Sequence, residues 1–267
     1  MTSEGPTHGA RSFPPEPPQQ SGSPDASVLD RPAWMSLTGA HAPFAERRGH
    51  AVRYPGEVSP FAAFAPEALP PPRTGPAGGG GAAPGEAGRA WEDLADLIGP
   101  GGFCVLPGVG EEPPPGWEVL LVVPCVQMIG SGVQPAGDPD AVRLGPGDVP
   151  EMLELVAATH PGPFEPRTIE LGTYLGLRRR GALVAMAGER FRPPGWSEIS
   201  AVCTAPGWEG QGLATRLVRA VAAEICRRGD TPFLHAAETN TNAIRLYEKL
   251  GFSHRRPMAF QAVLAPS

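Results

Sequence analysis

The sequence predicts an α/β fold in which helices flank a mixed, mostly antiparallel sheet. Two observations support this prediction. Short apolar runs within residues 141–189 end in a predicted hairpin, and a strand–helix–strand crossover follows within residues 198–236. A hairpin joined to a crossover places antiparallel and parallel neighbours in a single sheet.

The first predicted helix of this region follows a capping-box pattern, Asp148-Val-Pro-Glu151, with proline in the first turn. Met152, Leu155 and Val156 then share one face of the helix. Three short apolar runs before and after it are predicted strands: Ala141–Leu144, Tyr174–Leu177 and Leu183–Glu189.

The crossover begins with a strand rich in β-branched residues, Glu198–Thr204, and returns through a second strand, Pro232–Ala236. The helix between them ends at Gly229, a natural residue after a helix C-terminus. A further helix is predicted over Ala243–Leu250. The crossover helix has apolar residues at helical spacing: Leu213, Leu217, Val218, Val221, Ala222 and Ile225.

The turn between the first strand and the crossover helix contains Gly210 and Gly212. Glycine lets backbone N–H groups approach an anion closely, and the start of the helix adds unpaired donors and the positive end of its dipole. A diphosphate is the natural ligand for such a turn.

The residues after the second strand read Asn240-Thr-Asn-Ala-Ile-Arg-Leu-Tyr247 and close with Gly-Phe252. Together with the glycine turn, this pattern resembles the acetyl-CoA-binding half of the GNAT-type N-acetyltransferases, over about residues 140–262. One position departs from the family pattern, because Glu209 stands where the phosphate turn has Gln or Arg. A carboxylate there would repel the diphosphate unless it points into solvent.

The resemblance implies transfer of an acetyl group from acetyl-CoA to a primary amine of a small molecule or protein. Glu198 is the implied base, with Glu189 or a water path as alternatives, and Tyr247 is the implied acid for the CoA thiolate. The same residues also have structural interpretations: a solvated strand end for Glu198, helix packing for Tyr247 and an N-cap for Asn240. The implied cofactor-binding residues are Val202, Cys203, Thr204, Glu209, Gly210, Gln211, Gly212, Leu213, Ala214, Thr215, Asn240 and Tyr247.

Composition divides the chain into three predicted parts. Residues 1–28 form a Pro-rich tail that is expected to be disordered. Residues 139–267 form the GNAT-type unit, and residues 29–138 a smaller α/β unit, either a degenerate copy of the same fold or an unrelated cap. The smaller unit has predicted helices and strands at Trp34–Phe44, Trp91–Ile98, Phe103–Leu106, Trp117–Val123 and Val126–Ile129.

Several classes of function are disfavoured. The net charge of −6 argues against a nucleic-acid partner, and the four cysteines show no metal-ligand spacing. No apolar run approaches the roughly 20 residues that span a membrane. The expected protein is therefore a metal-free cytoplasmic enzyme, either a monomer or a homodimer. The alternative is a non-catalytic CoA-binding or regulatory protein on the same fold.

Overall fold

A computed structural model describes residues 24–69, 85–110 and 112–267. Most of the predicted tail lies outside these ranges, but its last residues belong to a 3₁₀ helix, η1 (Ala26–Asp30). No helix of the described ranges is both long and apolar enough to cross a membrane.

The main sheet has eight strands in the order β4-β11-β5-β10-β9-β8-β7-β6. Among its neighbouring pairs, only β9 and β10 run parallel. This confirms the predicted mixed, mostly antiparallel sheet. The strands are β4 (Phe103–Pro107), β5 (Glu118–Ile129), β6 (Ala141–Arg143), β7 (Tyr174–Arg179), β8 (Ala182–Glu189), β9 (Trp196–Thr204), β10 (Thr231–Ala237) and β11 (Ser253–Leu264).

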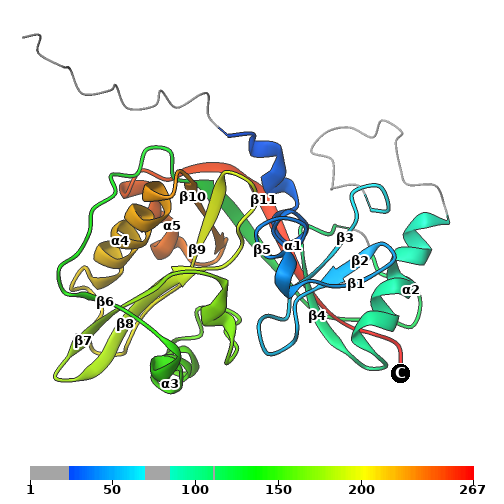
Figure 1. Cartoon of the computed structure of the whole chain (residues 1–267), viewed down its shortest axis with the longest axis horizontal. Coiled ribbons are helices and arrows are strands. Elements are labelled where there is room, and N and C mark those ends of the chain that lie inside the picture. The colour runs from blue at the N-terminus through cyan, green and yellow to red at the C-terminus, as the bar shows by residue number, and fades with distance from the viewer. Residues whose placement is uncertain (1–23, 70–84, 111) are drawn as a thin grey trace, which may run out of the picture.

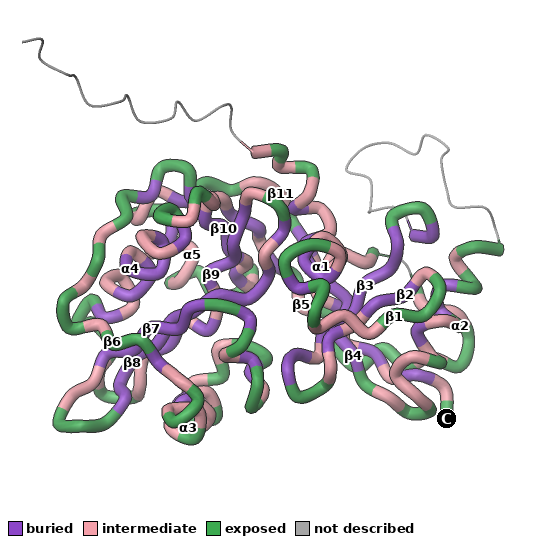
Figure 2. Tube along the Cα trace, in the orientation of Figure 1, coloured by how far each residue is buried: buried purple, intermediate pink, exposed green. Residues whose placement is uncertain are grey.

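Helices cover both faces of this sheet (Figure 1). On one face lie α4 (Leu213–Arg227) and α5 (Thr241–Lys249), and the apolar stripe predicted for α4 is buried throughout. On the other face lie α3 (Val149–Thr159), α1 (Pro32–Leu37) and η1. Buried residues follow the strands between these layers (Figure 2).

A second, three-stranded sheet lies beside the main one, with α2 (Glu86–Ile98) packed against it. Its strands were not predicted, because three-residue strands are too short to show a periodicity. They are β1 (Glu46–Arg48), β2 (Ala51–Arg53) and β3 (Ala62–Phe64), and the remaining 3₁₀ helices are η2 (Ala42–Phe44), η3 (Pro146–Asp148) and η4 (Thr168–Leu171).

Three local predictions were wrong. The helix expected over Trp34–Phe44 is split into α1 and η2. Asp148 does not cap α3; its carboxylate accepts instead from the Gly145 N–H at 2.8 Å. The two strands expected on either side of Pro124 form one continuous strand, β5.

Proline did not break β5, because β11 pairs with β5 on both sides of Pro124, which faces Ala259. On its other side β5 pairs with β10 only as far as Cys125, so Pro124 lies just beyond that ladder. The Pro124 carbonyl oxygen accepts from the Glu238 N–H at 2.9 Å, which adds one hydrogen bond at the end of β10.

Strands from both halves of the chain pair in the main sheet, since β4 and β5 precede residue 138. The N-terminal half also contains a crossover like that of the C-terminal half. In β3–α2–β4, Phe61 and Val105 form a parallel bridge, just as β9–α4–β10 joins two parallel strands. This similarity favours a degenerate copy over an unrelated cap, and both this choice and the division at residue 138 stay predictions.

We expect the shared sheet to make the two halves unfold together. Leu217→Ala in α4 should lower the free energy of unfolding by about 2–5 kcal/mol, because Leu217 is fully buried. The background has Trp34, Trp196 and Trp208 replaced by phenylalanine, so that emission comes from Trp91 and Trp117, which touch in the N-terminal core. Urea unfolding should then shift equally by far-UV circular dichroism and by this emission. Glu92→Gln on the exposed side of α2 is the control. A shift in circular dichroism alone would contradict the shared-sheet argument.

Candidate active site

The parallel strands β9 and β10 part beyond Glu198. Their pairing covers only three residue pairs and ends at Glu198 and Phe233. Beyond that point β9 stays paired with β8 and β10 with β5. The C-terminal parts of β9 and β10 therefore present facing edges that are not hydrogen-bonded to each other. Val202, Cys203 and Thr204 lie on this part of β9.

A bulge distorts β9 at the same level. Ala201 has a φ of +50°, which is rare for any residue other than glycine. The pairing register shifts between Met186 and Gly188 of β8, which face Cys203 and Ser200. Such bulges occur beside functional sites, where they redirect backbone groups. No local sequence pattern predicts this bulge, because alanine is an ordinary residue in a strand.

The glycine turn is open to its surroundings. Gly210 and Gly212 have φ values of +73° and +74°, and no atom lies within 4 Å of the place where a Cβ would stand at either residue. Within α4, Arg216 is the first residue whose N–H bonds back, at 3.1 Å, to the Gly212 carbonyl. The N–H groups of Leu213, Ala214 and Thr215 thus form the free first turn of α4. This turn contains no acidic residue, so the predicted anion site fits the structure.

Glu209 lies at the surface of this turn beside Gln211, which is also exposed. Its carboxylate accepts from the Gly207 N–H at 2.6 Å. The side chain therefore folds back onto its own turn. The negative charge that departs from the family pattern is partly satisfied by a local hydrogen bond.

Two predicted residues lie on or beside α5. Asn240 is its N-cap and accepts from the Ala243 N–H at 3.1 Å through Oδ1, which leaves its amide nitrogen free to donate elsewhere. Tyr247 is buried and packs edge-on against Phe252, with ring centroids 5.8 Å apart. Burial, with a smaller effect of Cys203, raises the pKa of Tyr247 to about 12. The phenol therefore keeps its proton at neutral pH.

Glu198 is fully buried and is not the solvated strand end considered above. Its two carboxylate oxygens accept from Arg190 at 2.6 and 2.8 Å, and Oε1 also lies 2.6 Å from Nδ1 of His235. Burial alone would raise the pKa of Glu198. The charges of Arg190 and His235, with the hydrogen bonds from both, outweigh it and lower this pKa to about 2. Glu198 is thus ionised but weakly basic.

Hydrogen bonds also orient the ring of His235. The Gln127 side-chain oxygen accepts from Arg255 at 2.6 Å, and its nitrogen donates to the Leu29 carbonyl at 2.8 Å. That nitrogen lies 2.9 Å from Nε2 of His235. The other ring nitrogen, Nδ1, lies 2.6 Å from Glu198, so His235 bridges Gln127 and Glu198.

Glu189, the alternative base, is also buried and fully bonded. It accepts from the Thr173 N–H at 3.0 Å and from the Ser197 hydroxyl at 2.5 Å, and it pairs with Arg228. Neither candidate carboxylate is therefore free to take a proton from a substrate without losing a cationic partner.

Comparison with known proteins identifies the family. The model of the FR47-like protein family matches residues 174–260, and no curated protein sequence matches the chain. A solved structure from Novosphingobium aromaticivorans DSM 12444, assigned to the GNAT family of acetyltransferases, is 40% identical, with a TM-score of 0.77. The match covers 90% of this chain and 99% of that one. The chain belongs to the GNAT family of acetyltransferases.

Two more distant structures share the fold of this GNAT protein. A GCN5-related N-acetyltransferase from Kribbella flavida has a TM-score of 0.56 at 17% identity, covering 88% of this chain and 94% of its own. A Drosophila protein has a TM-score of 0.58 at 15% identity, covering 90% and 89%. Because each match spans most of the chain, the N-terminal half belongs to the shared architecture.

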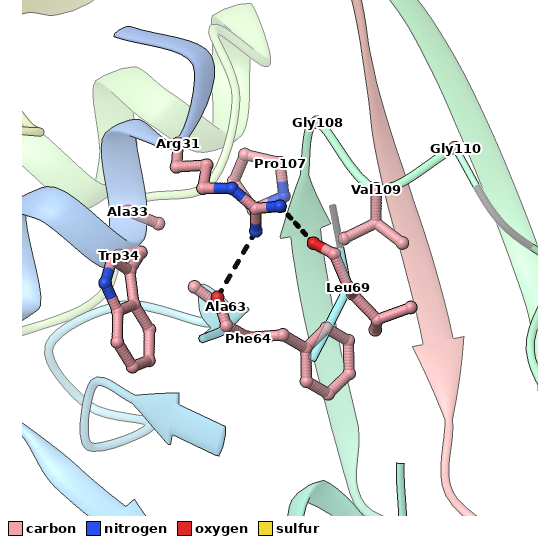
Figure 3. Close-up of a pocket in the computed structure, with 10 residues that line it drawn as sticks. All are labelled: Arg31, Ala33, Trp34, Ala63, Phe64, Leu69, Pro107, Gly108, Val109 and Gly110. Carbon is pink, nitrogen blue, oxygen red and sulfur yellow. Dashed lines mark hydrogen bonds between the residues drawn. The ribbon is translucent and has the colours of Figure 1, made fainter. Parts of the chain in front are cut away.

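In the N-terminal crossover of this GNAT protein, an arginine side chain occupies the space at the ends of the two strands. At the ends of β3 and β4 lies a cavity of only about 20 Å³ (Figure 3). The Arg31 guanidinium points into it and donates to the carbonyls of Phe64, at 3.4 Å, and Leu69. Within the described ranges, no group of His, Cys, Asp and Glu could hold a metal ion.

We expect the buried Glu198 pair to make stability pH-dependent. The native protein keeps Glu198 ionised down to about pH 2, whereas the unfolded chain binds its proton near the ordinary value of 4.5. Its contribution is therefore fully present above pH 4.5 and is lost as the pH falls toward 2. Glu198→Gln leaves Arg190 buried without its partner and should cost about 3–5 kcal/mol at neutral pH.

The measurement is urea unfolding of wild type and Glu198→Gln between pH 7 and pH 2. The difference between the two proteins should shrink on acidification, which separates Glu198 from all other carboxylates. A difference that stays constant over this range would show that the pair does not titrate as described.

Proposed function

We propose that this GNAT protein transfers the acetyl group of acetyl-CoA to a primary amine. The observation that supports this most directly is the open glycine turn at the start of α4, beside the point where β9 and β10 part. Gly210, Gly212 and the free N–H groups of the first turn of α4 would hold the diphosphate. Acetyl-CoA supplies the activated acyl group as a substrate.

The edge of β9 would hold the pantetheine arm. Main-chain groups of Val202, Cys203 and Thr204 would bond to its amides, together with the free amide nitrogen of Asn240. The bulge at Ala201 turns backbone groups out of the ladder with β8. An N–H freed in this way would stabilise negative charge on the thioester oxygen.

The reaction needs two proton transfers, one to the CoA thiolate and one from the amine. Tyr247 retains its proton at neutral pH and would donate it to the departing CoA thiolate. The amine must first lose a proton, and Glu198, Glu189 and water were the candidate acceptors. Because both carboxylates are held by arginines, we favour water as the acceptor. Glu198 would then have a positioning role, because its contact with Nδ1 of His235 fixes the orientation of that ring.

The ion pairs that hold both carboxylates also favour the rival function, a CoA-binding protein without turnover.

Gly212→Asp tests whether acetyl-CoA binds at the glycine turn, because it adds charge and bulk where the diphosphate would lie. We expect acetyl-CoA affinity in calorimetry to fall at least tenfold, which is about 1.4 kcal/mol. Gly229→Asp is the matched control, since Gly229 also has a positive φ, of +85°, and open space but lies beyond the other end of α4. Equal affinities for both variants would remove the diphosphate assignment.

Tyr247→Phe tests turnover. The ring and its packing on Phe252 remain, so stability and acetyl-CoA affinity should hold while kcat falls by roughly 10–100-fold. Thiol release from acetyl-CoA with a panel of amines measures this rate. Full activity in Tyr247→Phe would show that the thiolate leaves unprotonated. Tight acetyl-CoA binding without thiol release on any amine would favour the rival function.

A further inference from the structure

We propose that the acceptor binds in a cavity of about 320 Å³ at the C-terminal end of β10, and that this cavity selects amines with an apolar body, with the ammonium group held by Glu238. This inference rests on the proposed acetyl transfer and names the substrate class for it. The volume lies within the range of small-molecule sites.

The cavity lies at the end of the sheet where β9 and β10 part. Counting from the last pair, Glu198 and Phe233, four residues along each strand reach Val202 and Ala237. Glu238 comes next, just beyond the end of β10, where β9 and β10 are no longer paired. The cavity therefore lies at the same end of the sheet as the proposed reaction centre.

One wall runs across the neighbouring strands. The Glu238 N–H bonds to the Pro124 carbonyl of β5, and Pro124 pairs with Ala259 of β11. The Gly108 N–H, just after β4, bonds to the Ala259 carbonyl at 2.9 Å. These residues thus form a row across the sheet. Asp30 of η1 also lines the cavity, which places it on the face opposite α4 and α5.

The lining is mainly hydrocarbon. Val109, Pro124, Pro257 and Met258 contribute apolar side chains, and neighbouring glycines leave room beside them. An aliphatic or aromatic body would lose contact with water there, worth roughly 25 cal/mol per Å² of buried apolar surface. A polar acceptor would gain little from these walls.

The charged residues of the cavity differ in their partners. Asp30 and Arg256, which both line it, pair with each other at 2.8 Å, and Asp30 also pairs with Arg255 at 2.7 Å. Glu238 is exposed, and its carboxylate has no hydrogen bond or ion pair to any residue in the described ranges. Glu238 is therefore the charge in this lining that a ligand cation can pair with.

The test uses 2-phenylethylamine, an apolar-bodied amine, and ethanolamine, a polar one, with the full chain. We expect the wild-type KM to be at least tenfold lower for 2-phenylethylamine. Glu238→Gln should raise that KM roughly tenfold and leave kcat within threefold, because only the charge on the wall is removed. Val109→Trp should raise it as much by filling the cavity. Glu92→Gln removes an equally exposed carboxylate from α2 and should change neither constant.

Acetyl-CoA affinity of each variant separates the two proposals. If acetyl-CoA does not bind to wild type, the proposed function fails, and direct calorimetric binding of 2-phenylethylamine to wild type and Glu238→Gln still decides on the cavity. A wild-type KM in Glu238→Gln, or equal amine binding where there is no turnover, would overturn the inference. Weaker binding in both Glu238→Gln and Val109→Trp, with unchanged acetyl-CoA affinity, would support it.

Discussion

The position of β10 is set mainly by a strand from the other half of the chain. β10 pairs with β9 over only three residue pairs but with β5 over five. β5 can therefore hold β10 in place where β9 and β10 separate. A C-terminal half without β5 would leave the second edge of β10 unpaired and the opening without its outer support. The candidate cofactor site is thus a property of the whole chain.

Holding the two halves together buries several charges at the centre of the molecule. Arg190 lies over the rings of Phe61, Phe191 and Phe260, at 4.9–5.4 Å from their centroids, while it binds Glu198. Such a pair contributes stability only if the geometry satisfies both partners, and here bidentate bonding and aromatic stacking do so. The same contacts take away the basicity that the sequence pattern implies. The packing around Arg190 that joins the two halves therefore makes Glu198 a weaker base.

The sequence predicts those features whose cause is local. The stripe and ends of α4, the glycine turn and the Asn240 cap depend on residues a few positions apart, and all are present. Features with distant causes were missed. Pro124 marks a break locally, but β11 from the other end of the chain pairs with β5 on both sides of it. Glu198 looks solvated at the start of a strand, but residues from the N-terminal half cover its arginine partner. The bulge at Ala201 follows from pairing with β8, which no property of alanine reveals.

The two crossovers share a topology and differ in what lies at the ends of their strands. At β3 and β4, the Arg31 guanidinium occupies the opening and satisfies backbone carbonyls there, so only about 20 Å³ remains (Figure 3). The arginine side chain fills the place that a diphosphate would need there. At β9 and β10, the glycine turn presents free N–H groups and no side chain enters the space beside Gly210 and Gly212. Donors and open space coincide at this second crossover, which is why we place the chemistry there.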